Sequence, residues 1–259
     1  MPGPDRRLPR PRDATPVYRT ILVPYDDSDH SRSALALGQC LGGIADAELV
    51  VEDVTSRDLR DRAEEVGADL IVVDSAGRRL FHGAPCAVAV APAGFREREP
   101  AIRVIGVGLD GSHESKAALA SAVELGRAAG ATLRLFAAAH PPAIGPRRPS
   151  GYPTRDYMKA LRESFQDDLD AALASVPDVL GASGELLHGP AARTLAAEAG
   201  KGVDLLCVGS RGHGPLRRVL LGSVSRELAS QPPCPLLVVP RGAGGPPTEE
   251  TAAAGTESK

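Results

Sequence analysis

The sequence predicts an α/β fold that consists of two parallel-sheet units in tandem, the first of them truncated. Three features predict it. Short apolar runs bounded by turn residues alternate with segments of helical periodicity, as in parallel βαβ units. Three blocks of sequence recur in the same order in the two halves of the 259-residue chain. The second half has room for five strands, whereas the first half is too short for a complete copy.

The recurring blocks are short apolar runs that end in turn residues, so each is expected to be a buried strand. They are ILVPYDDS and IGVGLDGS, ADLIVVDS and VDLLCVGS, and PCAVAVAP and PCPLLVVP, at residues 21–28 and 105–112, 68–75 and 203–210, and 85–92 and 233–240. Because three matched blocks keep one order, we interpret the chain as a duplicated unit. An exposed apolar edge strand invites aggregation, so we expect the last strands of the two halves, Ala87–Ala91 and Leu236–Val239, to pair.

The second half contains every element of the expected unit. Serine or threonine before a helix and glycine after it mark the helix ends, and proline suits the first helical position. The expected elements are strand Val104–Leu109, a helix capped by Ser112 that ends at Gly130, strand Thr132–Ala138, a long helix capped by Thr154, strand Gly184–His188, a helix that starts at Pro190, strand Val203–Val208, and the last strand.

The first half lacks about one strand, one loop and one long helix. Asp26 and Asp69 are 43 positions apart, whereas the matching Asp110 and Asp204 are 94 apart. One strand, Glu48–Val51, takes the place of two.

A strand, a glycine-rich loop and a helix start follow one another after Val203. Gly209 ends the strand, and nine residues separate Gly212 from Gly222–Ser223. Glycines let the backbone approach an anion closely, and the first N–H groups of a helix bind phosphate with the help of its dipole. Arg211 adds positive charge. The segment predicts a phosphate-binding loop, with a plain surface turn as the alternative.

The first half is expected to have lost this loop. Gly77 and Cys86 are 9 positions apart, against 22 between Gly212 and Cys234. Asp74 stands where Gly209 stands in the second half, and a carboxylate there repels phosphate.

Composition excludes several classes of protein. The net charge of −3 shows no bias toward nucleic acid, and no apolar run is long enough for a membrane span. The four cysteines form no C-x-x-C pair, so Cys40, Cys86, Cys207 and Cys234 are expected to be buried thiols of a cytoplasmic protein, with no metal site. Residues 1–17 and 242–259 lack large apolar side chains in any pattern and are expected to be disordered tails.

The spacing G-x2-G-x9-G-S after a strand resembles the ATP-binding signature of the universal stress protein family, and the likeness extends over about residues 20–240. It implies two adenine-nucleotide α-hydrolase-like (Rossmann-like) units, a degenerate one at 18–95 and a complete one with the nucleotide site at 101–241. It implies ATP as the ligand, with Mg²⁺ left open. The nucleotide-binding residues that it implies are Gly108, Leu109, Asp110, Ala138, Val208, Gly209, Arg211, Gly212, Gly222, Ser223 and Val224. An aspartate such as Asp110 can also simply cap its own turn.

The resemblance further implies an ATP-binding regulator of the stress response with no catalytic residues, and it leaves a homodimer or a regulatory protein partner open. The alternatives are a slow ATPase or nucleotidyl-transfer enzyme of the same fold, and an interaction module without nucleotide. The Walker form G-x4-G-K-[ST] is absent. Gly106-x-Gly108-x-x-Gly111 matches the dinucleotide fingerprint formally, but Gly106 falls inside a strand and no acid ends the next strand.

Overall fold

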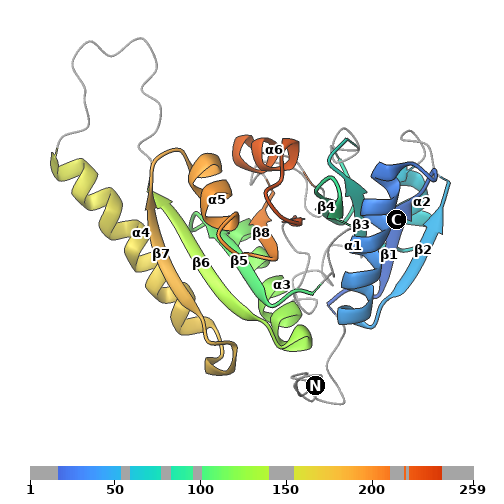
Figure 1. Ribbon diagram of the computed structural model, residues 1–259. Coiled ribbons are helices and arrows are strands. Elements are labelled where there is room, and N and C mark those ends of the chain that lie inside the picture. The colour runs from blue at the N-terminus through green and yellow to red at the C-terminus, as the bar shows by residue number, and fades with distance from the viewer. Residues whose placement is uncertain are drawn as a thin grey trace, which may run out of the picture.

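One sheet of nine strands forms the centre of the computed structural model, which describes residues 17–53, 59–76, 83–95, 101–139, 155–210, 219 and 222–240 (Figure 1). The strands are β1 (Thr20–Pro24), β2 (Glu48–Glu52), β3 (Leu70–Asp74), β4 (Ala87–Ala91), β5 (Val104–Leu109), β6 (Thr132–Ala139), β7 (Ser183–His188), β8 (Leu205–Gly209) and β9 (Leu236–Val239). The helices are α1 (Asp29–Ala45), α2 (Leu59–Glu65), α3 (His113–Ala129), α4 (Arg155–Ser175), α5 (Ala191–Ala199) and α6 (Ser223–Ser230), with a 3₁₀ turn η3 (Asp178–Leu180).

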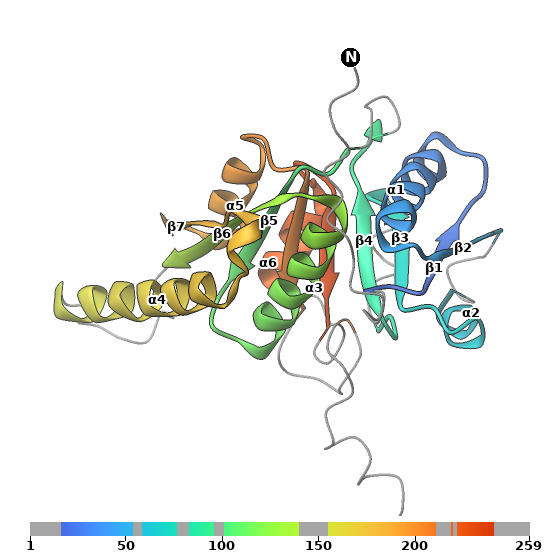
Figure 2. The same cartoon turned by 90° about the horizontal axis from the view of Figure 1, so that it is seen from below.

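Helices cover both faces of the sheet. Buried side chains of α1, α3 and α4 pack on one face, and those of α2, α5 and α6 pack on the other. Each of these two apolar cores runs through both halves of the chain. Figures 1 and 2 show the first half, blue to teal, directly beside the second half, green to red. The α/β fold expected from the sequence is confirmed.

The two halves have mirrored strand orders and meet at β4 and β9. The sheet order is β2-β1-β3-β4-β9-β8-β5-β6-β7, and β4–β9 is its antiparallel pair among otherwise parallel ones in the described residues. Ala89 pairs with Leu237, which holds the same position in the recurring block, and Val88 and Val90 pair with Val238 and Leu236. The junction therefore has the self-complementary register of a two-fold interface, and the expected pairing of the last strands is confirmed.

The second half has the five strands that the sequence predicts, with small differences at element ends: β6 ends at Ala139, β7 begins at Ser183 and β8 ends at Gly209, each one residue beyond the prediction. Pro190 is the cap of α5 and not its first helical residue, because its backbone is extended and its carbonyl accepts the first helical bond, from Thr194 N–H at 3.0 Å. The strand expected from Val203 begins at Leu205, because the carboxylate of Asp204 turns back to accept hydrogen bonds from the N–H groups of Arg103 and Val104. Thr154 and the two tails lie outside the described residues, except Val17.

Three of the four cysteines are buried as expected, but the prediction is wrong for Cys40. Cys40 lies on a flank of α1 that the neighbouring elements cover only in part. Burial raises the pKa of the Cys40 thiol to about 11 and that of Cys234 to about 12. None of the four cysteines, all of which lie in the described residues, is part of a disulfide bond.

Candidate functional site

The strand order reverses between β5 and β8, and open α/β sheets form a ligand-binding crevice at such a reversal. The connection from β5 through α3 leads to β6 on one side, whereas that from β8 through α6 leads to β9 on the other. α3 and α6 lie on opposite faces of the sheet. Ligands of open α/β sheets bind at such a point, outside the carboxyl ends of the strands. Gly108 and Val208 are register partners there, so the sequence-predicted residues of β5 and β8 are brought together.

The turn after β5 is held by Asp110 and Ser112. Asp110 Oδ1 accepts hydrogen bonds from the Ser112 N–H at 3.0 Å and from the Ser112 hydroxyl at 2.5 Å. The Ser112 oxygen in turn accepts the N–H of Ser115 and caps α3. Asp110 is exposed, and within the described residues its Oδ2 has no hydrogen-bond partner. Asp110 thus caps its own turn and still presents one carboxylate oxygen at the strand ends.

The start of α6 carries backbone donors that have no partner among the described residues. Gly222 caps this helix without a side chain, and the first helical bond in the described chain runs from Arg226 N–H to Gly222 C=O at 3.0 Å. No hydrogen bond from the N–H groups of Ser223 and Val224 exists within the part of the chain that the structure describes. These donors and the positive end of the helix dipole favour an anion.

The other strand-end residues of the predicted site place their side chains in the apolar cores. Leu109 is buried under α3 on one face, and Val208 is buried on the other. A side chain on Gly108 would lie 3.2 Å from Leu195 of α5, so α5 fills that space. Ala138, level with Asp110 in the register, packs on the same face as Leu195. A ligand at this edge can therefore use mainly the backbone atoms of these residues.

Gly209 has a packing role that the sequence did not indicate. A β-carbon on Gly209 would lie 2.6 Å from the carbonyl carbon of Glu114 and 2.8 Å from the backbone nitrogen of Ser115. The absence of a side chain therefore lets the first turn of α3 lie against the end of β8. Glu114 is only 4% exposed, and no described residue hydrogen-bonds or ion-pairs with its carboxylate. No sequence signal marks Glu114 as a buried acid beside the site.

Arg211 and Gly212 lie outside the described residues, but Val219, three residues before Gly222, is described and buried. Its N–H donates to the carbonyl of Ala84 at 2.9 Å, and its carbonyl accepts the N–H of Gly83 at 3.0 Å. Residues of the first half thus bind the expected phosphate-binding segment of the second half. In the sequence, the apolar run Val219–Leu221 between Arg218 and Gly222 is the feature that could have indicated a buried residue here.

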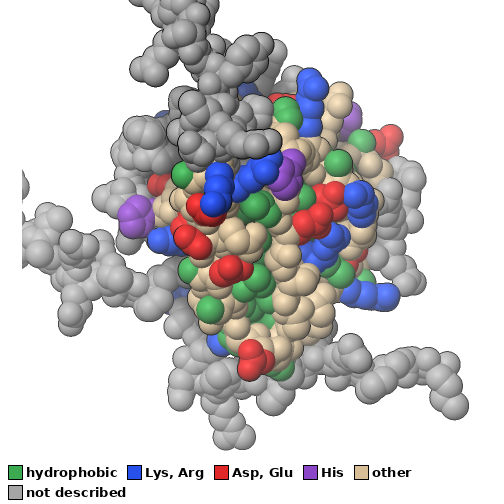
Figure 3. Space-filling view, turned by 90° about the vertical axis from the view of Figure 1, so that its left-hand side faces the viewer, with side chains coloured by type: hydrophobic (Ala, Val, Ile, Leu, Met, Phe, Trp, Pro, Cys, Tyr) green, Lys and Arg blue, Asp and Glu red, His purple; other side chains and the backbone are tan. Residues whose placement is uncertain are grey.

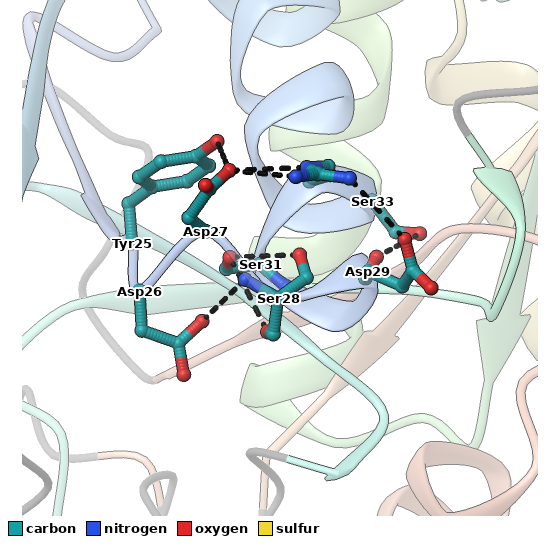
Figure 4. Close-up of polar contacts among 8 residues, drawn as sticks. Tyr25, Asp26, Asp27, Ser28, Asp29, Ser31 and Ser33 are labelled. Atoms are coloured by element: carbon teal, nitrogen blue, oxygen red, sulfur yellow. Dashed lines mark hydrogen bonds and ion pairs between the residues drawn. The ribbon is translucent and has the colours of Figure 1, made fainter.

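The first half reproduces the turn of the candidate site (Figure 4). Asp26 Oδ1 accepts the Ser28 N–H at 3.0 Å, and Ser28 accepts the Ser31 N–H at 3.1 Å. Hydrogen bonds from Ser28 lower the pKa of Asp26 to about 2. Asp27 takes the place of Gly111 with a φ of +62° and accepts bonds from the Tyr25 hydroxyl and the Arg32 guanidinium, both at 2.8 Å.

The first half differs where β8 has Gly209. The carboxylate of Asp74 lies 3.1 Å from Nδ1 of His30 and also accepts the Ala76 N–H at 2.9 Å. His30 holds the position of Glu114 in the recurring sequence. A histidine–aspartate pair therefore lies at the end of β3, where the second half has a glycine against the backbone of α3.

The sequence profile of the universal stress protein family matches residues 101–240, which include every described residue of the candidate site. The chain belongs to the universal stress protein family. It is 30% identical to Universal stress protein Rv2624c of Mycobacterium tuberculosis over 54% of this chain and 49% of that protein. It is 28% identical to Universal stress protein YxiE of Bacillus subtilis over 51% of this chain and 95% of that protein. The matched region spans about half the length of the Mycobacterium relative.

Two solved structures share the fold over both halves. A universal stress protein from Archaeoglobus fulgidus is 15% identical with a TM-score of 0.57, over 86% of this chain and 98% of that one. The functionally unknown protein PA1789 from Pseudomonas aeruginosa is 17% identical with a TM-score of 0.54, over 86% of this chain and 82% of that one. At these identities the likeness shows the fold alone, which is the adenine-nucleotide α-hydrolase-like fold of the family.

Proposed function

We propose that this protein binds one adenine nucleotide, ATP, in the crevice between β5 and β8 and acts as a nucleotide-linked regulator of the stress response. The observation that supports the proposal most is that the first N–H groups of α6 and Oδ2 of Asp110 have no hydrogen-bond partner within the described residues. Free N–H groups at the start of α6 suit a phosphate, and the free oxygen of Asp110 suits a ribose hydroxyl. Both lie in the region that matches the family.

The phosphate end would be held by backbone. The N–H groups of Ser223 and Val224 donate to phosphate oxygens, and Gly222 lets the phosphate come close. Arg211 and Gly212 would add charge and a further glycine, as their spacing in the sequence implies. Within the described ranges, no group of three or more His, Cys, Asp or Glu side chains is placed to hold a metal ion. Mg²⁺ would therefore enter with the nucleotide, and its chemical contribution would be to neutralise phosphate charge.

The first half would be a degenerate copy of the family unit that binds no nucleotide. It keeps the Asp26 turn, but it lacks the glycine loop and carries the carboxylate of Asp74, paired with His30, at the end of β3. The first half pairs with the second half in the sheet, through β4 and β9 in a two-fold register. We therefore expect the chain to regulate another protein and not to need a second copy to complete its sheet.

On the side that Figure 3 shows, the described residues present both basic and acidic side chains and no face of one charge. Basic and acidic side chains alternate there, around the end of the molecule that carries α4 and β7. Among the described helices, none combines the length and the apolar composition that crossing a bilayer requires. Four cysteines without a disulfide bond among them are typical of a reducing compartment, and we propose the cytoplasm.

Mass spectrometry of nucleotide that co-purifies with the protein, followed by titration calorimetry with ATP, tests the proposal. Gly222→Asp puts a carboxylate at the start of α6 and is expected to abolish binding while the fold persists. Gln231→Asp adds the same charge at the other end of α6, where it is exposed, and is the matched control. Absence of ATP binding by the wild type, or equal affinity of both variants, contradicts the proposed site.

A further inference from the structure

Two hydrogen bonds connect the halves next to the candidate site. Val219 and Ala84 form an antiparallel bridge outside the named strands, with bonds of 2.9 Å from Val219 N–H to Ala84 C=O and 3.0 Å from Gly83 N–H to Val219 C=O. We call these two bonds the inter-half bridge. It lies just before β4 on one side and three residues before Gly222 on the other.

The bridge is buried. Val219 is 0% exposed and Ala84 is 3% exposed, and both belong to the apolar core that also contains Cys86, Cys234 and residues of α6. A buried hydrogen bond that loses one partner leaves the other unsatisfied, so this contact is costly to open. Val219 is thus anchored by its side chain and its backbone together.

Gly83 has a backbone conformation that favours glycine. Its φ is +84°, and the guanidinium of Arg60 in α2 occupies the space that a side chain would need. An L-residue is strained at this φ and would also displace Arg60. The position of Gly83, and through it that of Val219, is therefore determined by elements of the first half.

We propose that Gly83 and Ala84 are positioning residues for the nucleotide site of the other half. By holding Val219, they fix the approach of the chain to Gly222–Ser223, where phosphate would bind. The first half, without a nucleotide site of its own, then contributes to the affinity of the second. This inference rests on the proposed function for its ligand, but the bridge itself can be measured without any ligand.

Gly83→Pro tests the inference because proline has no N–H to donate to Val219 and cannot adopt a φ of +84°. Gly67→Pro is the matched control in the same half. It removes the N–H that donates to Glu64, at a φ of +65°, with open space around the α-carbon. Net hydrogen-bond strengths correspond to about two- to tenfold in affinity per bond. We expect Gly83→Pro to weaken ATP binding about tenfold, and Gly67→Pro to leave it within about twofold.

Val219→Ala is the second variant, in case Gly83→Pro does not fold. It keeps the backbone and removes the buried side chain, and Val72→Ala, at a buried position of β3, is its control. We expect weaker ATP binding only for Val219→Ala. A wild type that binds ATP, together with unchanged affinity in every folded bridge variant, overturns the inference and leaves the proposed function standing.

Amide hydrogen exchange on the protein without nucleotide separates the two proposals. We expect the Val219 amide to be protected in the wild type and in Gly67→Pro, and to exchange faster in Gly83→Pro or Val219→Ala. An unprotected Val219 amide in the wild type overturns the bridge whatever ATP does. A protected and variant-sensitive amide in a wild type that binds no ATP contradicts the proposed function, while the bridge stands as a support of the α6 start.

Discussion

Replacing Gly209 with alanine tests whether the close packing of β8 against α3 requires a glycine at this position. The added β-carbon would lie 2.6 Å and 2.7 Å from the carbonyl and β-carbons of Glu114 and 2.8 Å from Ser115 N. Two of these three atoms are backbone atoms of a helix, so no side-chain rotation relieves the clash. The first turn of α3 must move away from the sheet, or the strand end must bend.

Overpacking of this kind costs about 1–3 kcal/mol. For a chain of this size, a loss of about 2 kcal/mol lowers the midpoint of thermal unfolding by about 4–8 °C. The same movement displaces Ser112, which holds Asp110, so we also expect weaker ATP binding. Both effects come from one steric cause and should appear together.

Thermal unfolding followed by circular dichroism, with calorimetric titration of ATP, measures the two effects. Gly43→Ala is the control, because Gly43 lies in the last turn of α1 with nothing within 4 Å of an added β-carbon. Alanine is the better helix former there by about 0.5–1 kcal/mol, so this variant should be at least as stable as the wild type. A Gly209→Ala protein with an unchanged midpoint would refute the packing argument.

Calorimetry should find one ATP per chain, unaffected by Asp26→Ala, because the first half lacks the glycine loop and has the carboxylate of Asp74 in place of Gly209. A stoichiometry near two would contradict this. With a thiol reagent at about pH 8, Cys40 should react before Cys86, Cys207 and Cys234, because these three are buried and burial raises their pKa values. Equal reaction rates of all four thiols would contradict this. The pKa of Asp26 is lowered from 3.8 to about 2 in the folded chain, so its contribution to stability is present above the ordinary value and is lost as the pH falls toward 2. Denaturation of wild type and Asp26→Asn across this range should therefore show a stability difference that shrinks on acidification; a difference independent of pH would contradict it.

The sequence by itself determined the features that depend on near neighbours. The caps Ser28 and Ser112, the left-handed Gly130 and the apolar strands were predictable because each needs only a few adjacent residues. The pairing of β4 with β9 was also predictable, since two apolar edges in one chain have a clear reason to join. The order of strand, glycines and helix predicted a phosphate-binding site at the start of α6. That nucleotide binds there remains a prediction.

Only the tertiary structure decided features that depend on the distance between segments far apart in sequence. Gly209 has no room for a side chain, because the backbone of Glu114 and Ser115 lies against it. Those residues come about one hundred positions earlier in the sequence. The burial of Glu114 in α3 and the partial exposure of Cys40 in α1 depend on how these helices pack on the sheet. Val219 meets Ala84 from the other half through backbone groups, which every residue carries and no sequence pattern distinguishes.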